Sequence, residues 1–273
     1  MHDSPPPDLA DSFRRYFTLM PALSDEQRRA TYRIRHDVYC RDLAWEPLRP
    51  DGQETDDYDR HSAACLMRAA QNDSLVGCLR LVLCRPEDPA YPLPLERACA
   101  GTLDRNRFDP SRLDRHRIAE VSRLAVERDY RRRKGEANQP VAIDTSDFGD
   151  TSHQRFPFIP VGLYLSAFAM AAQLGIDHLL VLTEPRLARH LGRIGLDIQP
   201  IGGAIEHRGE RIPSVMDTRA TIANLHPMMH RMWKQIHAWV EDAFVSAGAD
   251  AVPWRSQLAG IETLPPQGII VRP

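Results

Sequence analysis

Hydrophobic residues near the N-terminus repeat with the spacing of a helix. Ala30, Ile34 and Val38 are four residues apart, which places them on one face of an amphipathic helix. Ser24 and Gln27 have the spacing of a capping box, so the helix should begin at this point. The pattern predicts a helix to about residue 40, preceded by a short strand at residues 16–20.

Short apolar runs further along the chain predict strands. Residues 62–70 and 75–84 are joined by the polar segment 71–74, which is typical of a hairpin. Residues 118–126 form another strand candidate. Residues 178–183 are almost entirely apolar, as expected for a strand that is buried on both faces.

Further helices are indicated by proline and glycine at their ends. Pro160 and Gly175 bracket an apolar helix, and Pro185 and Gly195 bracket a shorter one. A long helix is expected at residues 224–246, after two extended segments. Strands and helices in this order predict a single mixed α/β sheet flanked by helices.

The predicted elements divide the chain into one folded domain and less regular parts. The domain is expected at residues 16–220, with a flexible insertion at 138–158, where the sequence shows no periodicity. We expect a flexible tail at 1–15, a separate C-terminal helix at 221–250 and an irregular tail at 251–273.

Composition places the chain among soluble globular proteins. Its 273 residues include 35 basic and 37 acidic ones, and the net charge of -2 argues against a nucleic-acid or anionic-membrane binder. The longest nearly apolar stretch, residues 161–172, is too short to span a bilayer, and no signal peptide is evident, so we expect a cytoplasmic protein. The five cysteines form no C-x-x-C pair and should be reduced core thiols.

Charged and aromatic residues gather near the end of the first predicted helix. Arg35 and Tyr39 share a helix face, Trp45 follows just beyond, and Asp56 and Asp59 lie in the next loop. On spacing alone, a solvated face with a surface arginine–aspartate pair explains this pattern more simply than a functional site does.

The same residues belong to an ordered series that resembles the signature of a known family. The series is Arg35-x-x-Val-Tyr39-x-x-x-x-x-Trp45, then Asp56-x-x-Asp59, then Arg80 in Gly-Cys-Leu-Arg-Leu, then Glu120-x-x-Arg123. It resembles the acyl-homoserine lactone autoinducer synthases. Shorter segments around these residues, such as Glu54-Thr-Asp-Asp-Tyr-Asp59 and Gly209-Glu-Arg-Ile-Pro213, more closely resemble the PEP-CTERM/exosortase system-associated acyltransferases. These acyltransferases are also described as N-acyl amino acid synthases.

The resemblance implies a Gcn5-related N-acyltransferase (GNAT) fold with a C-terminal helical extension. In this fold, two parallel strands splay apart and admit the pantetheine arm of an acyl thioester, and here they would be residues 118–126 and 178–183. The implied reaction moves a fatty acyl group from acyl carrier protein, or acyl-CoA, to the amino group of an amino acid or related amine. No tightly bound cofactor is implied.

Glu120 is the candidate general base that the resemblance implies, acting through a water. Acylation requires the amine to lose a proton and places negative charge on the carbonyl oxygen. The competing role for Glu120 is an ion pair with Arg123. Residues three apart on a regular strand point to opposite faces, so Glu120 and Arg123 can converge only across a bulge. Such a bulge would also free a backbone N–H for the thioester oxygen.

The resemblance also implies a charged network beside the cleft. Its members would be Arg35, Asp56, Asp59 and Arg123. The acids would hold the substrate amine, and the arginines would be available for its carboxylate.

Other residues of the series are assigned to substrate binding. These residues are Arg80, Tyr39 and Trp45. Arg80 could instead hold the edge of the sheet, and Trp45 could instead be a packing residue. Phe168 and Met170 could line an acyl-chain tunnel, although plain core packing is the commoner role of such residues.

A basic loop follows the strand at 118–126. Arg132-x-x-Gly135-x-Ala137 matches the family's loop that cradles the phosphate of coenzyme A or phosphopantetheine, but the following residues depart from the pattern. Arg128 and residues 131–134 could instead be a solvent-facing basic run or a docking site for acyl carrier protein. We favour docking, because the rest of the chain is not basic.

Two other functions stay open at this stage. One is a true homoserine lactone synthase that uses S-adenosylmethionine, and the other is a catalytically silent module that binds an acyl thioester. His226, His230 and His237 have permissive metal spacing, but no cysteine or acidic ligand pattern joins them, so we expect a plain helix face and no metal.

Overall fold

A mixed sheet forms the centre of the computed structural model, which describes residues 8–85, 87–131 and 157–248. Its strands are β1 (Phe17–Pro21), β2 (Ser62–Ala69), β3 (Leu75–Leu83), β4 (Ile118–Val126), β5 (His178–Thr183), β6 (Gln199–Pro200), β7 (Ile205–Glu206) and β8 (Glu210–Asp217). Their order is β1-β2-β3-β4-β5-β8-β6, with β7 paired to β8. Among these pairs only β4 and β5 run parallel. The predicted α/β class is confirmed.

The described residues contain seven α-helices, of which those that begin at Asp25, Phe158 and Pro185 start near the predicted signals. They are α1 (Leu9–Tyr16), α2 (Asp25–Arg35), α3 (Pro94–Ala98), α4 (Phe158–Gln173), α5 (Pro185–Gly192), α6 (Thr218–Asn224) and α7 (His230–Ala247). Short turns of 3-10 helix are η2 (Asp57–His61), η3 (Pro110–Arg112), η4 (Arg115–Arg117), η5 (Arg128–Tyr130) and η8 (Pro227–Met229). Ser24 starts α2 with the predicted capping box. A π-helix, η1 (His36–Asp42), continues α2 directly, so the predicted helix ends in a wider coil.

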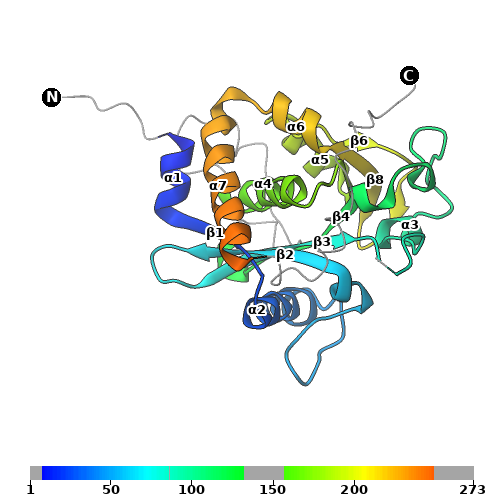
Figure 1. Cartoon of the computed structure of the whole chain (residues 1–273). Coiled ribbons are helices and arrows are strands. Elements are labelled where there is room, and N and C mark those ends of the chain that lie inside the picture. The colour runs from blue at the N-terminus through cyan, green and yellow to red at the C-terminus, as the bar shows by residue number, and fades with distance from the viewer. Residues whose placement is uncertain (1–7, 86, 132–156, 249–273) are drawn as a thin grey trace.

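Helices cover both faces of the sheet. α4, α1 and α7 pack on one face, and α2 lies against the other (Figure 1). Because side chains alternate along a strand, Leu79 and Leu81 of β3 join the α4 core, whereas Val82 joins a cluster on the opposite face. α4 itself is buried from Phe158 to Ala171, which explains why its sequence is apolar on every side.

The predicted flexible tail at residues 1–15 is wrong for its second half. Leu9–Tyr16 form α1, which Asp8 caps by accepting a hydrogen bond from the Ala10 N–H. Phe13 is fully buried, with its ring centroid 6.0 Å from that of Phe158. A short helix of this kind is stabilised by packing rather than by its own propensity, so the local sequence gave little signal.

The long helix predicted at residues 224–246 is also corrected. Pro227 interrupts it, and α7 begins only at His230. It is part of the main core rather than a separate extension, since its buried side chains join the cluster around α4. These are Met232, Ile236, Val240 and Phe244.

The structure also bears on the predictions for the cysteines, membrane-spanning helices and irregular segments. All five cysteines are buried and free, as predicted. Within the described ranges, we find no helix with the length and apolar character needed to cross a membrane. Most of the predicted insertion at 138–158, and the tail at 251–273, lie outside the described residues.

Candidate active site

The parallel strands β4 and β5 are paired over only part of their length. The ladder begins at Ile118 opposite His178 and ends at Val121 opposite Val181. Both strands continue beyond this point, β4 to Val126 and β5 to Thr183. The splayed parallel pair that the resemblance implied is therefore confirmed, on the same residues.

β4 carries a bulge where it leaves β5. On its other side, Cys78 of β3 faces Ala125, but Arg80 faces Ser122, so β4 has one residue more than β3 in this interval. Arg123 lies in the bulge with φ 48°, a left-handed backbone conformation that is unfavourable for a residue with a Cβ. β4 thus has a bulge, but it lies between Ser122 and Ala125, and the strand is regular from Glu120 to Ser122.

Arginines and carboxylates form a network on the face of the sheet that carries α2. Arg35 lies deepest: its Nε donates to Glu54 Oε2 (2.5 Å), and its Nη1 and Nη2 donate to the two oxygens of Asp59 (2.6 and 3.0 Å). Arg80 then joins the two aspartates, with Nη1 2.6 Å from Asp56 Oδ1 and 3.0 Å from Asp59 Oδ1. Each of these hydrogen bonds is charge-assisted, so the cluster is well ordered.

Arg123 completes this network from the bulge. Its Nη2 lies 3.1 Å from Glu54 Oε1 and 3.2 Å from Asp56 Oδ2. Among the described residues, Arg123 makes no ion pair with Asp59, so the predicted meeting of these two residues is indirect. The link between them runs through the shared partners.

The network occupies the space between two apolar clusters. On β3, Cys78 packs in the cluster around α2 and Val82 packs in the cluster around α3, with Arg80 between them. β3 is an interior strand, so the alternative that Arg80 holds the sheet edge is wrong. Its Nε donates to Ser122 Oγ (3.0 Å), which ties the network to β4.

The carboxylates of the network are ionised despite their burial. Burial by itself raises the pKa of Asp59, but the hydrogen bond and charge of Arg35 outweigh it and hold this pKa at about 2. Burial also opposes ionisation of Glu54 and Asp56, and their arginine partners still lower both pKa values. The charges therefore compensate one another within the protein.

Only part of the network reaches solvent. The side chains of Arg35 and Glu54 are 2% and 3% exposed, whereas those of Arg123 and Asp56 are 23% and 28% exposed. A bound molecule can therefore contact Arg123 and Asp56, but the deeper members hold these two in place.

Glu120 lies on β4 immediately before the strands part. Its side chain is buried, and its Oε2 accepts a hydrogen bond from the Leu95 N–H in the first turn of α3 (2.7 Å). Within the described residues it forms no ion pair with Arg123, so that competing role is wrong. Burial raises the pKa of Glu120 to about 8. The hydrogen bond from the Leu95 N–H and the charge of Arg80 lower this pKa, but their effect is smaller than that of burial.

Tyr39 and Trp45 line the approach to the bulge. The Tyr39 hydroxyl donates to the Leu124 carbonyl (2.9 Å), and its ring stacks on Trp45 at 6.0 Å between centroids. Arg208, in the turn between β7 and β8, places its guanidinium 5.3 Å from the Trp45 ring and donates to Glu46 Oε1 (2.6 Å). The β7–β8 turn thus contacts the loop after η1.

Glu54, Glu46 and Arg208 are site residues that the sequence reasoning did not select. Glu54 stands within the family-like segment, so its position two residues before Asp56 could have indicated it. Arg208 lies far from the series in the sequence, and only the fold brings it to Glu46.

The basic loop is only partly described. Arg132, Gly135 and Ala137, the predicted phosphate cradle, lie outside the described residues. Arg131 is buried and pairs with Asp42 (2.5 Å), so the prediction that it belongs to a solvent-facing or docking surface is corrected.

The acyl-tunnel and metal-site candidates can be compared with the structure. Phe168 and Met170 are buried in the core around α4, which is the plain packing role. Across the described ranges, no group of three histidine, cysteine or acidic side chains is placed to hold a metal ion.

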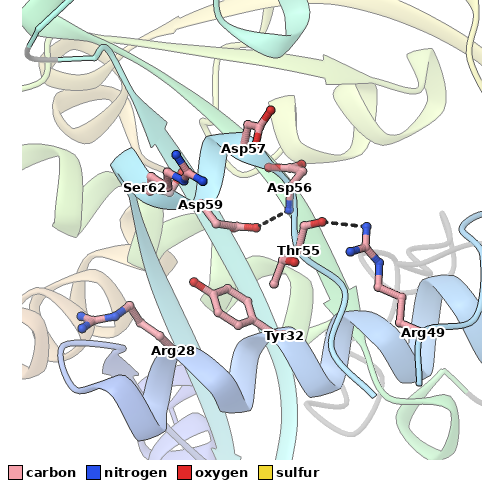
Figure 2. A pocket seen from close by; sticks show the side chains of 9 residues that line it. Arg28, Tyr32, Arg49, Thr55, Asp56, Asp57, Asp59 and Ser62 are labelled. Atoms are coloured by element: carbon pink, nitrogen blue, oxygen red, sulfur yellow. Dashed lines mark hydrogen bonds between the residues drawn. The ribbon is translucent and has the colours of Figure 1, made fainter. Parts of the chain in front are cut away.

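A polar cavity of about 780 Å³ lies beside the network (Figure 2). It opens between α2, which contributes Tyr32, and η2, which contributes Asp59. The full lining is Arg28, Tyr32, Arg49, Thr55, Asp56, Asp57, Asp59, Arg60 and Ser62.

Comparisons with known proteins agree with this architecture. The family model described as an acetyltransferase (GNAT) domain matches residues 34–138. An acyl-homoserine-lactone synthase of Pseudomonas fluorescens is 24% identical over 203 residues, which cover 72% of this chain and 82% of the relative.

Solved structures show the same fold at low sequence identity. BjaI, described as a CoA-dependent acyl-homoserine lactone synthase with SAM and isopentyl-CoA, aligns with a TM-score of 0.53 and 21% identity, over 79% of this chain and 89% of BjaI. TofI, in a ternary complex with an inhibitor and MTA, aligns with a TM-score of 0.52 and 20% identity, over 78% and 98% of the two chains. The domain match over residues 34–138 and the splayed β4–β5 pair both support an acyltransferase with a GNAT fold.

Proposed function

We propose that this acyltransferase moves a fatty acyl group from a phosphopantetheine thioester to the amino group of an amino acid or related amine. The observation that carries the proposal is the adjacent pair Asp56 and Arg123, 3.2 Å apart and partly exposed at the bulge where β4 leaves β5. An amino acid carries an ammonium and a carboxylate on neighbouring atoms. The exposed acid and arginine match these two charges.

Each step of the transfer then has a residue assigned to it. The thioester lies between β4 and β5, and a backbone N–H of the bulge binds the carbonyl oxygen while it carries negative charge. Arg123 holds the acceptor carboxylate and Asp56 its amine. Glu120 takes the amine proton through a water, because its own carboxylate lies under α3. The N–C bond forms, the C–S bond breaks, and the pantetheine thiol leaves.

The raised pKa of Glu120 is compatible with this role. A general base acts best when its pKa lies near the working pH, and burial raises that of Glu120 to about 8. The other proposed contacts are Tyr39, which positions the bulge, and Trp45 and Arg80, which support the acceptor site. Arg132, Gly135 and Ala137 are proposed to bind the donor's phosphate.

The donor is either acyl carrier protein or acyl-CoA. The motif resemblance favours the carrier protein, whereas the relative BjaI is described as CoA-dependent. We propose the carrier protein as the physiological donor.

A second candidate is synthesis of an acyl-homoserine lactone from S-adenosylmethionine. It is favoured by two of the relatives named above, the Pseudomonas fluorescens protein and BjaI, which are described as acyl-homoserine lactone synthases. In that reaction, the same acyl transfer is followed by ring closure, which releases methylthioadenosine.

Product analysis separates these candidates. Purified protein is incubated with acyl carrier protein or CoA thioesters and either a mixture of amino acids or S-adenosylmethionine, and products are identified by mass spectrometry. An N-acyl amino acid supports the first proposal, and a lactone with methylthioadenosine supports the second. Binding of the thioester with no product from any acceptor would indicate a silent binding module instead.

A further inference from the structure

The cavity between α2 and η2 lies apart from the gap between β4 and β5. Ser62, in its wall, faces Val82 across the sheet, Val82 faces Glu120, and Glu120 faces Leu180. Neighbouring strands are about 4.8 Å apart, so Ser62 is roughly 10 Å from β4 and roughly 14 Å from β5. Ser62 is therefore remote from the gap, whereas Asp56, on another part of the lining, pairs with Arg123 at the bulge.

The ion-pair network lies between the cavity and the gap between β4 and β5. Asp59 lines the cavity and pairs with Arg35 and Arg80, which lie behind it. Asp56 also lines the cavity, and it pairs with Arg123 on the bulge. The cavity and the proposed acceptor site therefore share part of one network.

The cationic groups of the cavity have unused hydrogen-bonding capacity. The Arg60 side chain makes no hydrogen bond or ion pair with the other described residues. Arg49 uses one nitrogen on the Thr55 carbonyl (Nη2 to O, 2.9 Å), which leaves its other donors available. Arg28 is held at the rim by Asp25.

The acids of the cavity contribute less charge than their number suggests. Asp56 and Asp59 are already neutralised by the arginines of the network. Asp57 is the lining acid without such a partner in the described part of the chain. The uncompensated charge of the lining is therefore mainly positive.

Hydroxyl groups complete a site for an anion. Tyr32 lines the cavity and faces it with a hydroxyl that makes no hydrogen bond to the described residues (Figure 2). Burial and the charge of Asp59 raise the pKa of Tyr32, so this hydroxyl remains a donor at neutral pH. The Thr55 and Ser62 side chains add polar groups to the same wall.

We propose that this cavity binds a small organic or inorganic anion, through a carboxylate or phosphate group held by Arg60, Arg49 and the Tyr32 hydroxyl. The site adjoins the acceptor site of the proposed function, because Asp56 belongs to the lining of the cavity and also pairs with Arg123. Because Asp56 and Asp59 line the cavity and are also members of the ion-pair network, occupancy of the cavity is linked to the network beside the bulge.

The test measures binding without any acyl donor, so it does not depend on the proposed reaction. Succinate and inorganic phosphate are titrated separately into the full-length protein by calorimetry, at constant ionic strength. We expect saturable binding of at least one of them, and the one that binds identifies the group that the site prefers. Absence of saturable binding by both would overturn the proposal.

Variants locate the binding. Arg60→Gln should weaken it about tenfold, the effect of losing one charge-assisted contact, and Tyr32→Phe should weaken it by a smaller factor. Asp57→Asn should tighten it about twofold or more, since a repelling charge is removed. The control is Arg112→Gln, at an arginine whose side chain is 82% exposed on η3, and it should change nothing. Equal affinities for Arg60→Gln and Arg112→Gln, with both variants folded by circular dichroism, would place any bound anion elsewhere.

Discussion

Arg35 and Asp59 are joined by two parallel hydrogen bonds, although they are 24 residues apart in the sequence. Nη1 lies 2.6 Å from Oδ1 and Nη2 lies 3.0 Å from Oδ2. Their side chains are only 2% and 8% exposed. A buried pair of this kind depends on both partners, because either charge alone would be buried without compensation.

Removal of one partner should therefore be costly. Asp59→Ala is expected to lower the free energy of unfolding by about 3 kcal/mol, the usual cost of breaking a buried ion pair. The matched control is Arg41→Ala, which removes an exposed ion pair with Asp37 and should cost less than about 0.5 kcal/mol. Urea unfolding measures both values. Similar small losses in the two variants would contradict the buried network.

Coupling energies should follow the direct contacts. A double-mutant cycle between Asp56→Asn and Arg123→Gln should give at least about 1 kcal/mol, since these side chains touch. The cycle between Asp59→Asn and Arg123→Gln should give a smaller value, because Arg35 and Arg80 lie between them. Coupling in the reverse order would mean that the pairing within the network is different.

The backbone at Arg123 gives an unusual expectation for glycine. At φ 48°, glycine is unstrained and alanine is not. Arg123→Gly should therefore be more stable than Arg123→Ala by about 1 kcal/mol, although both lose the guanidinium. Leu81→Gly and Leu81→Ala on β3 provide a comparison at a regular strand position, where glycine should be the less stable of the two. If alanine is also favoured at position 123, the bulge does not persist in solution.

Glu120→Gln should separate catalysis from folding. Its amide oxygen can still accept from the Leu95 N–H, but it cannot take a proton, so acyl transfer near neutral pH should fall about a hundredfold. Glu127→Gln is the control, because Glu127 directly follows β4 and burial raises its pKa to about 7. That variant should keep its initial rate. An unchanged rate in Glu120→Gln would remove Glu120 from the role of base.

The same variant should alter how stability depends on pH. The pKa of Glu120 is raised by burial from 4.5 to about 8, so the folded protein keeps a proton that the unfolded chain releases. Stability arising from this group is therefore complete below about pH 4.5 and falls until about pH 8. Glu120→Gln has no such titration, so its stability relative to the unmodified protein should rise across this range. Denaturant unfolding at a series of pH values measures the difference, and a constant difference would show that Glu120 titrates normally.

Local sequence patterns determined where the central strands lie. The runs at residues 118–126 and 178–183 coincide with β4 and β5, because a short, mostly apolar run is the local pattern of a buried strand. The spacing of Glu120 and Arg123 predicted a bulge only on the condition that their side chains converge, and in the structure these side chains do not pair. Ser24 and Gln27 specified the start of α2 for the same local reason.

Only the tertiary structure decided which charges meet and how they titrate. Arg123 pairs with Glu54 and Asp56 rather than with Glu120, because the bulge and the loop before η2 set the distances between them. Likewise, α1 exists because Phe13 finds a place in the core, which its own short segment cannot show. The pKa of Glu120 depends on the exclusion of water by residues from other parts of the chain. Spacing along a chain fixes neighbours within an element, whereas burial and ion pairing depend on elements that are brought together only by folding.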